Sequence, residues 1–373
     1  MADRRSDEAD RLPEPTAEEL EPIRRLPKVH LHDHLDGGLR PETIVELARE
    51  QGVDLPTDDA ESLRSWFHRG ANRGSLPLYL EGFAVTTAVM QTEEALHRVA
   101  LERVEDLAAD GVVYGEVRFA PILHVDGGLN LEQVLQAVLE GIRDGCDRTG
   151  IDVRIIICGM RHMEPATNLE MAELAVDFRD RGVVGYDLAG DEAGHPPKRH
   201  IEAFHFLQRE NFNITIHAGE AFGLASIWQA IQFCGAHRIG HATRLIEDLE
   251  ESESGKRSSG TLTSYVDDHR ICLEMCLSSN VHTGAVPRLE DHPFPQYLRR
   301  RYRVCLNVDN YLMSATTLSR EWWIARELYR LTLDELELIA VNGAKGAFCH
   351  HPERVILIDR KIKPAFQLAR EHA

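Results

Sequence analysis

The chain has 373 residues, of which 43% are hydrophobic, so it can bury a large core as one α/β barrel or as two average domains. A formal net charge of −19 argues against non-specific binding to nucleic acid or to a membrane surface. The seven cysteines are scattered and form no Cys-x-x-Cys pair, which favours reduced thiols in a cytoplasmic protein. Neither a signal peptide nor an apolar run long enough for a membrane span is visible.

The N-terminal residues 1–22 are polar, acidic and rich in proline, which predicts a tail with a short helix near Ala17–Leu20. Residues 23–373 contain no linker that would divide them, so we expect a single domain there. Within it, Val29–Gly37 reads Val-His-Leu-His-Asp-His-Leu-Asp-Gly. Its three histidines alternate, and a strand would point them to the same side. By itself, the pattern fits either a metal site or histidines that only pack or bond locally.

Helical patterns follow this first strand. Pro41–Arg49 has proline at a helix's first turn, and residues 50–110 continue with helices and loops. This is much longer than an ordinary connection between a strand and a helix. In a barrel enzyme such an insertion is a place for a lid, although plain helical packing explains the same pattern.

Short β-type runs then alternate with helical segments. The runs are Val112–Phe119, Val153–Cys158, Val183–Leu188, Ile214–Ile216, Arg238–Gly240, Ile271–Met275 and Val304–Leu306. The helical segments are Leu131–Arg148, Met171–Phe178, Ile201–Glu210, Ala225–Phe233, Leu262–His269, Phe294–Arg301, Ser319–Leu328 and Leu333–Phe348, followed by a polar C-terminal segment. With the histidine strand, this order predicts a parallel (β/α)8 TIM barrel with a helical insertion after its first strand. Glu250–Gly260 is rich in Ser and Gly and predicts a loop.

Residues that bind metals or transfer protons gather at the predicted carboxyl ends of seven strands, where barrel enzymes place their active sites. They are His32, His34 and Asp36; Arg118; Asp187–Glu192; His217 and Glu220; His241; Ser278–Asn280; and Asn307–Asn310. One such residue is more often structural than functional, but seven strand ends together indicate a site.

Three histidines and one carboxylate suit a zinc ion that keeps a water-filled position. The candidate ligands are His32, His34, His217 and Asp309. Glu220 and His241 would place two titratable groups beside a metal-bound water, which is a hydrolytic arrangement.

Five segments in series closely resemble the adenosine deaminase family. They are Leu26–Gly37, Asp187–Glu192, Thr215–Glu220, Arg238–His241 and Leu306–Asn310, and the resemblance extends from Leu26 to Phe348. It implies a (β/α)8 zinc hydrolase that converts adenosine, and 2′-deoxyadenosine, to inosine-type products and ammonia in purine salvage.

The resemblance also implies roles for single residues. One zinc ion per chain would lie on the four candidate ligands, because the strand-four end lacks the lysine of related two-metal hydrolases. Glu220 would protonate purine N1, and His241 would orient and help deprotonate the attacking water. Substrate contacts would come from His34, from Asp36 to the ribose hydroxyls, from the Gly190 N–H to N3, and from Asn310 to N7.

Several positions depart from the family's usual pattern or stay ambiguous. Asn310 stands where a second Asp is usual, although its amide can donate to N7. His30 stands where Glu is common, and we expect it to support the ligands from one layer below. Asp187 and Asp191–Glu192 are either catalytic or, as we favour, supports of the Gly190 loop. Arg118 is expected to be a buried ion-pair partner.

The expected partner is therefore a small purine nucleoside, and no oligomeric state can be read from the sequence. Four other functions stay open. They are a deaminase of adenine, a deaminase of a modified adenine nucleoside, a mononuclear metallohydrolase acting on an unrelated amide or ester, and a non-catalytic nucleoside-binding relative. Asp36 favours the nucleoside over free adenine, because adenine-specific family members have Glu at this position.

Overall fold

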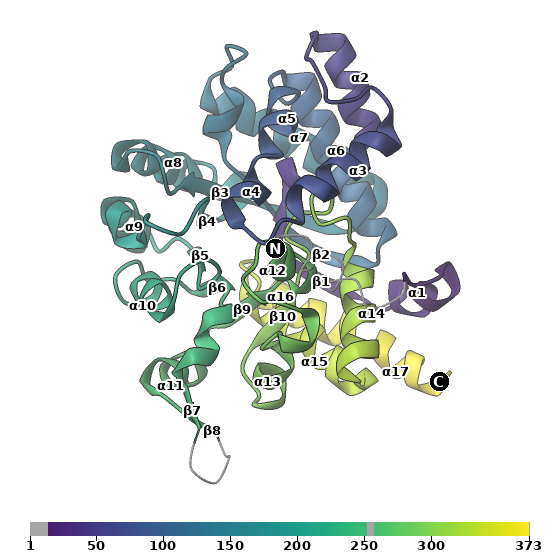
Figure 1. Ribbon diagram of the computed structural model, residues 1–373, viewed down its shortest axis with the longest axis vertical. Coiled ribbons are helices and arrows are strands. Elements are labelled where there is room, and N and C mark those ends of the chain that lie inside the picture. The colour runs from purple at the N-terminus through teal and green to yellow at the C-terminus, as the bar shows by residue number, and fades with distance from the viewer. Residues whose placement is uncertain (1–13, 252–256, 373) are drawn as a thin grey trace, which may run out of the picture.

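The computed structural model describes residues 14–251 and 257–372, and it places helices around a central group of parallel strands (Figure 1). One sheet has the order β1-β2-β3-β4 and the other β10-β9-β6-β5. The bounds are β1 (Lys28–His34), β2 (Val112–Phe119), β3 (Asp152–Met160), β4 (Val183–Ala189), β5 (Thr215–Ala218), β6 (Arg238–His241), β9 (Cys272–Met275) and β10 (Val304–Leu306).

Two isolated parallel bridges join these sheets at both edges. Asp33 pairs with Asp309 between β1 and the end of β10, and Tyr186 pairs with Ile214 between β4 and the start of β5. The eight strands therefore follow one another around a ring, in the order of a (β/α)8 barrel. The predicted fold class is confirmed.

The two faces of β1 differ as its alternating sequence predicts. Val29 and Leu31 lie against α15 (Leu333–Gly346), where a side chain at Gly343 or Gly346 would collide with β1 or β9. His32 and His34 face the inside of the ring, where the His32 ring lies 4.8 Å from that of His241. Helices cover the outside of parallel strands, so outward residues such as Val29 and Leu31 are apolar.

Helices cover the outside of the ring and also form a separate lobe, drawn in purple and blue at the top of Figure 1. The covering helices include α6 (Glu93–Ala109), α7 (Leu131–Thr149), α8 (Pro165–Asp177), α9 (Ile201–Arg209), α10 (Leu224–Gln232), α11 (Thr261–Asp268), α13 (Phe294–Arg299) and α14 (Leu318–Tyr329). The lobe contains α2 (Pro41–Gln51), α3 (Ala60–Ala71), α4 (Leu76–Leu80) and α5 (Phe83–Ala88). The helical insertion after the first strand is thereby confirmed.

Three segments carry structure beyond the prediction. The C-terminal segment, predicted only to be polar, is helical, with α16 (His351–Ile356), a π-helical turn at Leu357–Ile362 and α17 (Lys363–Glu371). Leu357, Ile362 and Phe366 are buried there, and the π turn shifts their spacing away from the ordinary helical period. The other two differences are α1 (Ala17–Arg24), which is longer than predicted, and two antiparallel strands, β7 (Leu249–Glu251) and β8 (Arg257–Ser259), at the ends of the predicted Ser/Gly loop. Residues 252–256 of that loop lie outside the described residues.

Residues 1–13 of the predicted tail lie outside the described residues. Within the described ranges, no helix is both long enough and apolar enough to cross a membrane.

Candidate metal and catalytic site

The four predicted metal ligands meet at the carboxyl end of the ring. One donor atom from each of His32, His34, His217 and Asp309 lies within 4.8 Å of the other three. His34 Nε2 is 3.2 Å from His217 Nε2 and 3.3 Å from Asp309 Oδ1, and His32 Nε2 is also 3.3 Å from that oxygen. Donor atoms about 2.0–2.1 Å from a tetrahedral zinc ion are themselves about 3.3 Å apart. The donor set and its spacing therefore fit a zinc-sized ion.

Hydrogen bonds behind the ligands fix which nitrogen faces the site. His217 Nδ1 lies 2.9 Å from Asp187 Oδ2, and His32 Nδ1 lies 2.8 Å from Glu274 Oε2. A carboxylate can only accept, so each Nδ1 carries the proton and each Nε2 presents a lone pair. The buried Nε2 of His32 accordingly has no hydrogen-bond partner among the described residues. These contacts prepare both imidazoles to bind a metal.

Asp187 and Arg118 belong to this supporting layer. Burial favours a higher pKa for Asp187, but His217 and Arg118 outweigh burial and hold its pKa well below the ordinary value. Arg118 Nη1 donates to Asp187 at 2.8 Å, and its Nη2 donates to Glu274 at 2.9 Å. Arg118 is thus the predicted buried ion-pair partner.

Glu192 supports a different loop from the one predicted. Its carboxylate accepts four backbone N–H groups, from Gly219, Glu220, Ala221 and Phe222, at 2.7, 3.0, 2.7 and 3.0 Å. The prediction of a structural role was correct, but the segment held is the one that carries Glu220 rather than the Gly190 loop. Asp191, by contrast, lines the cavity beside the ligands and bonds only locally, to the Ala193 N–H.

Glu220 is a buried carboxyl group close to the ligands. It is 4% exposed, and its Oε1 has no hydrogen-bond partner among the described residues. Burial, reinforced by the charges of Asp309 and Glu192, raises the pKa of Glu220 well above its ordinary value. This environment favours the protonated acid and gives Glu220 a proton to donate.

A chain of hydrogen bonds sets the tautomer of His241. The Phe294 N–H donates to His292 Nδ1 at 3.1 Å, so neutral His292 has its proton on Nε2, which lies 3.1 Å from Asn280 Oδ1. Asn280 Nδ2 then donates to His241 Nδ1 at 2.9 Å. Neutral His241 must therefore carry its proton on Nε2, which is 3.5 Å from Glu220 Oε2. Asn280 and His292 were not assigned these roles from the sequence.

The ligands open into a cavity of about 370 Å³. The predicted substrate residues His34, Asp36, Gly190 and Asn310 all line it, as do Glu220 and His241. Gly190 has a φ of +95°, a backbone conformation that suits glycine. Asp36 Oδ1 and Asn310 Oδ1 have no hydrogen-bond partners among the described residues.

The cavity also contains a buried carboxyl group, that of Asp36, and a partly apolar wall. Burial is the main cause that raises the pKa of Asp36, to about 7. Leu76, Tyr79, Leu80 and Phe83, from α4 and α5, form part of the wall. The insertion therefore contributes directly to the site, although lid motion stays a prediction.

His30 is part of the packing below the ligands, as expected. Its ring is fully buried, its Nε2 accepts the Val308 N–H at 3.0 Å, and its ring meets Tyr311 edge-on at 5.8 Å. Asp33, on the outer side of β1, accepts from Arg103 Nε of α6 at 2.8 Å. These contacts fix the strand that carries two ligands.

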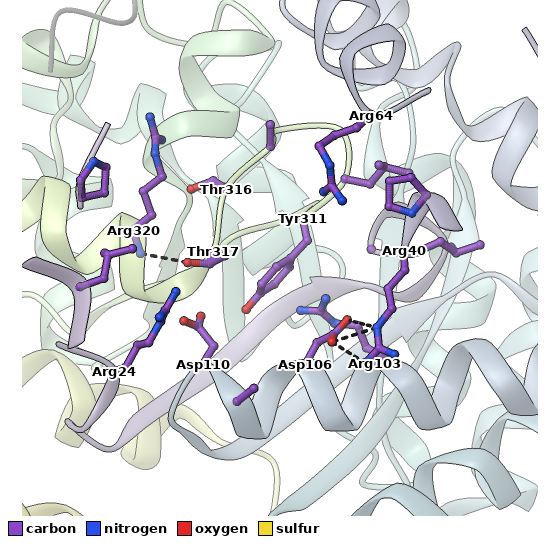
Figure 2. A pocket seen from close by; sticks show the side chains of 18 of the residues that line it. Arg24, Arg40, Arg64, Arg103, Asp106, Asp110, Tyr311, Thr316, Thr317 and Arg320 are labelled. Atoms are coloured by element: carbon purple, nitrogen blue, oxygen red, sulfur yellow. Dashed lines mark hydrogen bonds and ion pairs between the residues drawn. The ribbon is translucent and has the colours of Figure 1, made fainter. Parts of the chain in front are cut away.

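A second cavity, of about 660 Å³, lies behind the segment that follows β10 (Figure 2). Figure 2 shows arginine and aspartate side chains interleaved around Tyr311. Arg40 Nη2 lies 2.6 Å from Asp106 Oδ1, and the Arg103 guanidinium lies 3.5 Å from the centre of the Tyr311 ring. The segment after Asn310 is therefore held from behind by α6.

Comparison with known proteins identifies the family. A family model described as adenosine deaminase matches residues 27–364, which include every candidate site residue. The chain belongs to the adenosine deaminase family. Adenosine deaminase 1 of Streptomyces coelicolor is 53% identical over 350 residues, covering 92% of this chain and 88% of the relative. The adenosine deaminase of Mycobacteroides abscessus is 52% identical over 358 residues, covering 94% and 98%.

Solved structures of adenosine deaminase relatives have the same architecture. An N6-methyl-AMP deaminase from Arabidopsis thaliana is 26% identical with a TM-score of 0.78, covering 95% of this chain and 100% of that one. An adenine deaminase from Arthrobacter aurescens is 24% identical with a TM-score of 0.82, covering 93% and 99%, and supports the fold alone. The family is metal-dependent, and the described residues of this member contain one His/Asp group that fits a metal.

Proposed function

We propose that this protein hydrolyses adenosine and 2′-deoxyadenosine to inosine-type products and ammonia, with one zinc ion held by the four ligands. The observation that carries the proposal is the position of the buried Glu220 carboxyl group, whose pKa burial raises, in the same cavity as the ligand cluster. When bound, zinc would lower the pKa of a water molecule and make hydroxide available at neutral pH. Free thiols at all seven cysteines agree with a cytoplasmic role in purine salvage.

The side chains divide the proton transfers between them. Glu220 donates a proton to purine N1, which makes C6 more electrophilic and so favours attack by water oxygen. His241 presents Nε2–H and orients that oxygen, while the Asp309 carboxylate accepts a water proton. The C6–O bond forms, and the proton taken up by Asp309 passes to the amino group. The C6–N bond then breaks to release ammonia, and the C6 hydroxyl gives its proton to Glu220 as the C6 carbonyl forms, which restores the acid. In this proposal, the tautomer favoured by Asn280 makes His241 a donor to the water, rather than the helper in deprotonation that the family resemblance implied.

The remaining cavity residues would bind the nucleoside. The Gly190 N–H would donate to N3, the Asn310 amide to N7, and Asp36 would meet the ribose hydroxyls. Asp36 Oδ1 is buried and has no hydrogen-bond partner among the described residues, which supports a contact to the ribose hydroxyls. His34 would contact the bound molecule from the ligand side. Leu76, Leu80 and Phe83 offer the apolar surface.

Replacing Asn280 with leucine should lower kcat by about 10–100-fold, because the hydrogen bond that fixes the His241 tautomer is lost. KM for adenosine should change little, since Asn280 does not line the cavity. Steady-state kinetics measure both parameters. Replacement of Asn280 by aspartate gives a sharper test. A carboxylate would draw the His241 proton to Nδ1, so this variant should lose at least as much kcat as the leucine variant. Full kcat in both variants would contradict the donor role of His241.

The cavity also favours a nucleoside over a nucleotide. No Arg or Lys is among the described residues that line it, so a 5′-phosphate would find neither a guanidinium nor an ammonium partner there. We expect kcat/KM for adenosine and 2′-deoxyadenosine to exceed that for AMP, N6-methyl-AMP and adenine by at least about 100-fold. Loss of substrate absorbance with the zinc-loaded protein measures all five. If kcat/KM for a nucleotide or for adenine equalled that for adenosine, that compound would become the proposed substrate. If none of the five compounds were turned over, the protein would instead be a non-catalytic relative.

A further inference from the structure

A third cavity, of about 640 Å³, lies at the opposite end of the barrel from the ligands. Its walls come from residues at the amino ends of strands, including Arg238 at the start of β6 and Arg303 just before β10, and from the turn after α15. His241, at the other end of β6, lines the catalytic cavity instead. We call this third space the basal cavity. It is separate from the proposed catalytic site.

The lining of the basal cavity carries one sign of charge. Five of its residues are cationic and four more are histidines, whereas no Asp or Glu is among the described residues that line it. The cations are Arg238, Arg270, Arg303, Lys345 and Arg354. The cavity of Figure 2 differs, because Glu14, Asp106 and Asp110 lie among its five arginines. Five cations without a carboxylate among the described lining residues are unexpected in a chain with a net charge of −19.

Two of the five cations form ion pairs with carboxylates that do not line the cavity. Arg238 lies 2.6 Å from both Glu116 and Glu274, and Arg270 lies 2.5 Å from Asp267. Even so, Arg238 is 1% exposed and its Nη2 has no hydrogen-bond partner among the described residues. An unpaired buried donor costs free energy unless something binds it.

The other three cations form no ion pair with any described carboxylate. Arg354 donates only to backbone oxygens, those of Lys345 at 3.3 Å and Ala347 at 3.5 Å. Arg303 Nε is buried without a hydrogen-bond partner, and burial together with Arg270 and Arg354 lowers the Arg303 pKa. Like charges that converge without an intervening carboxylate repel one another, and a bound anion would relieve that repulsion.

We propose that the basal cavity binds a small phosphate-bearing anion, with Arg303, Lys345 and Arg354 as its cationic ligands. Two guanidinium groups offer paired N–H donors that match phosphate oxygens, and a lysine adds a point charge. The cavity is larger than the catalytic one, at about 640 Å³ against about 370 Å³, so a diphosphate or a nucleoside phosphate can enter. The proposal goes beyond the deaminase reaction, because none of these residues lines the catalytic cavity.

Calorimetric titration of the zinc-loaded full-length protein tests this site at low ionic strength. Separate arms use orthophosphate, diphosphate, a nucleoside triphosphate and citrate as a carboxylate comparison. We expect one equivalent of diphosphate or nucleoside triphosphate to bind, more weakly as salt rises. Comparison of the dissociation constants of diphosphate and the nucleoside triphosphate shows whether the cavity prefers an inorganic or an esterified phosphate. No binding of any phosphate, or equal binding of citrate, would overturn the proposal.

Matched variants locate the binding. Lys345 is exposed, so the Lys345→Gln change should leave the fold intact and weaken binding about 3–10-fold. Combining it with Arg303→Gln should weaken binding by at least about 30-fold. The control is the pair Arg330→Gln and Lys361→Gln, which removes the same charge from exposed positions outside the cavity. Equal affinity in the cavity pair and the control pair would place the anion elsewhere and contradict the inference.

Discussion

Replacing Glu220 with glutamine is expected to lower kcat for adenosine by about 10²–10⁴-fold while zinc stays bound. Glutamine has nearly the same shape but no acidic proton to give to N1. The loop itself should keep its position, because Glu192 holds it through backbone N–H groups rather than through the Glu220 side chain. Steady-state kinetics and metal analysis of the same preparation measure the two effects.

The matched control for this change is Glu202→Gln, an exposed glutamate on α9. It removes the same charge and should retain full activity. If Glu220→Gln kept kcat within tenfold of the unmodified protein, Glu220 would not be the acid. Loss of zinc together with activity would instead show that the substitution disturbed the ligand cluster.

Replacing Glu274 with glutamine is expected to lower the free energy of unfolding by about 3–5 kcal/mol. The fully buried carboxylate lies 2.6 Å from Arg238 and 2.9 Å from Arg118, so its removal leaves two buried guanidinium groups without full compensation. It also bonds His32 Nδ1 at 2.8 Å, and loss of that acceptor should weaken zinc binding by about 10–100-fold. Urea denaturation and zinc competition with a chelator measure the two losses.

A surface ion pair provides the comparison for Glu274. Glu353 lies 3.2 Å from Arg154, and the two side chains are 40% and 31% exposed. The Glu353→Gln change should therefore cost no more than about 1 kcal/mol. If Glu274→Gln cost no more than this control, the buried pairs around Glu274 would contribute little to stability.

The convergence of the four candidate ligands was predictable because each lies in, or directly follows, a recognisable strand pattern. His32 and His34 alternate on one strand, and His217 and Asp309 follow buried strand patterns that end at the same face of a barrel. Strand order then brings all four together without further information. The roles of Glu220 and His241 came from the resemblance to a family and not from spacing alone.

The supporting contacts were harder to predict because each joins segments far apart in the chain. Asn280 meets His241 and His292 only after α12 (Leu277–His282) has formed and packed. The partner of Glu192 depends on how the loop after β5 directs its backbone N–H groups, which side-chain patterns do not encode. Glu274 did leave a signal, since a charged residue inside the buried run Ile271–Met275 requires a partner.

The bridge between Asp33 and Asp309, which closes the strand ring, can form only late in synthesis. His34 N–H donates to Asp309 O, and Asp309 N–H donates to His32 O, so the ligands' own backbones join the first strand to the last. A nascent chain carries the candidate ligands His32 and His34 long before Asp309 leaves the ribosome. A product that stops before β10 would have an open sheet edge and an incomplete ligand set. Tight metal capture therefore reports that the chain has emerged at least through Asp309 and that the first and last strands have paired.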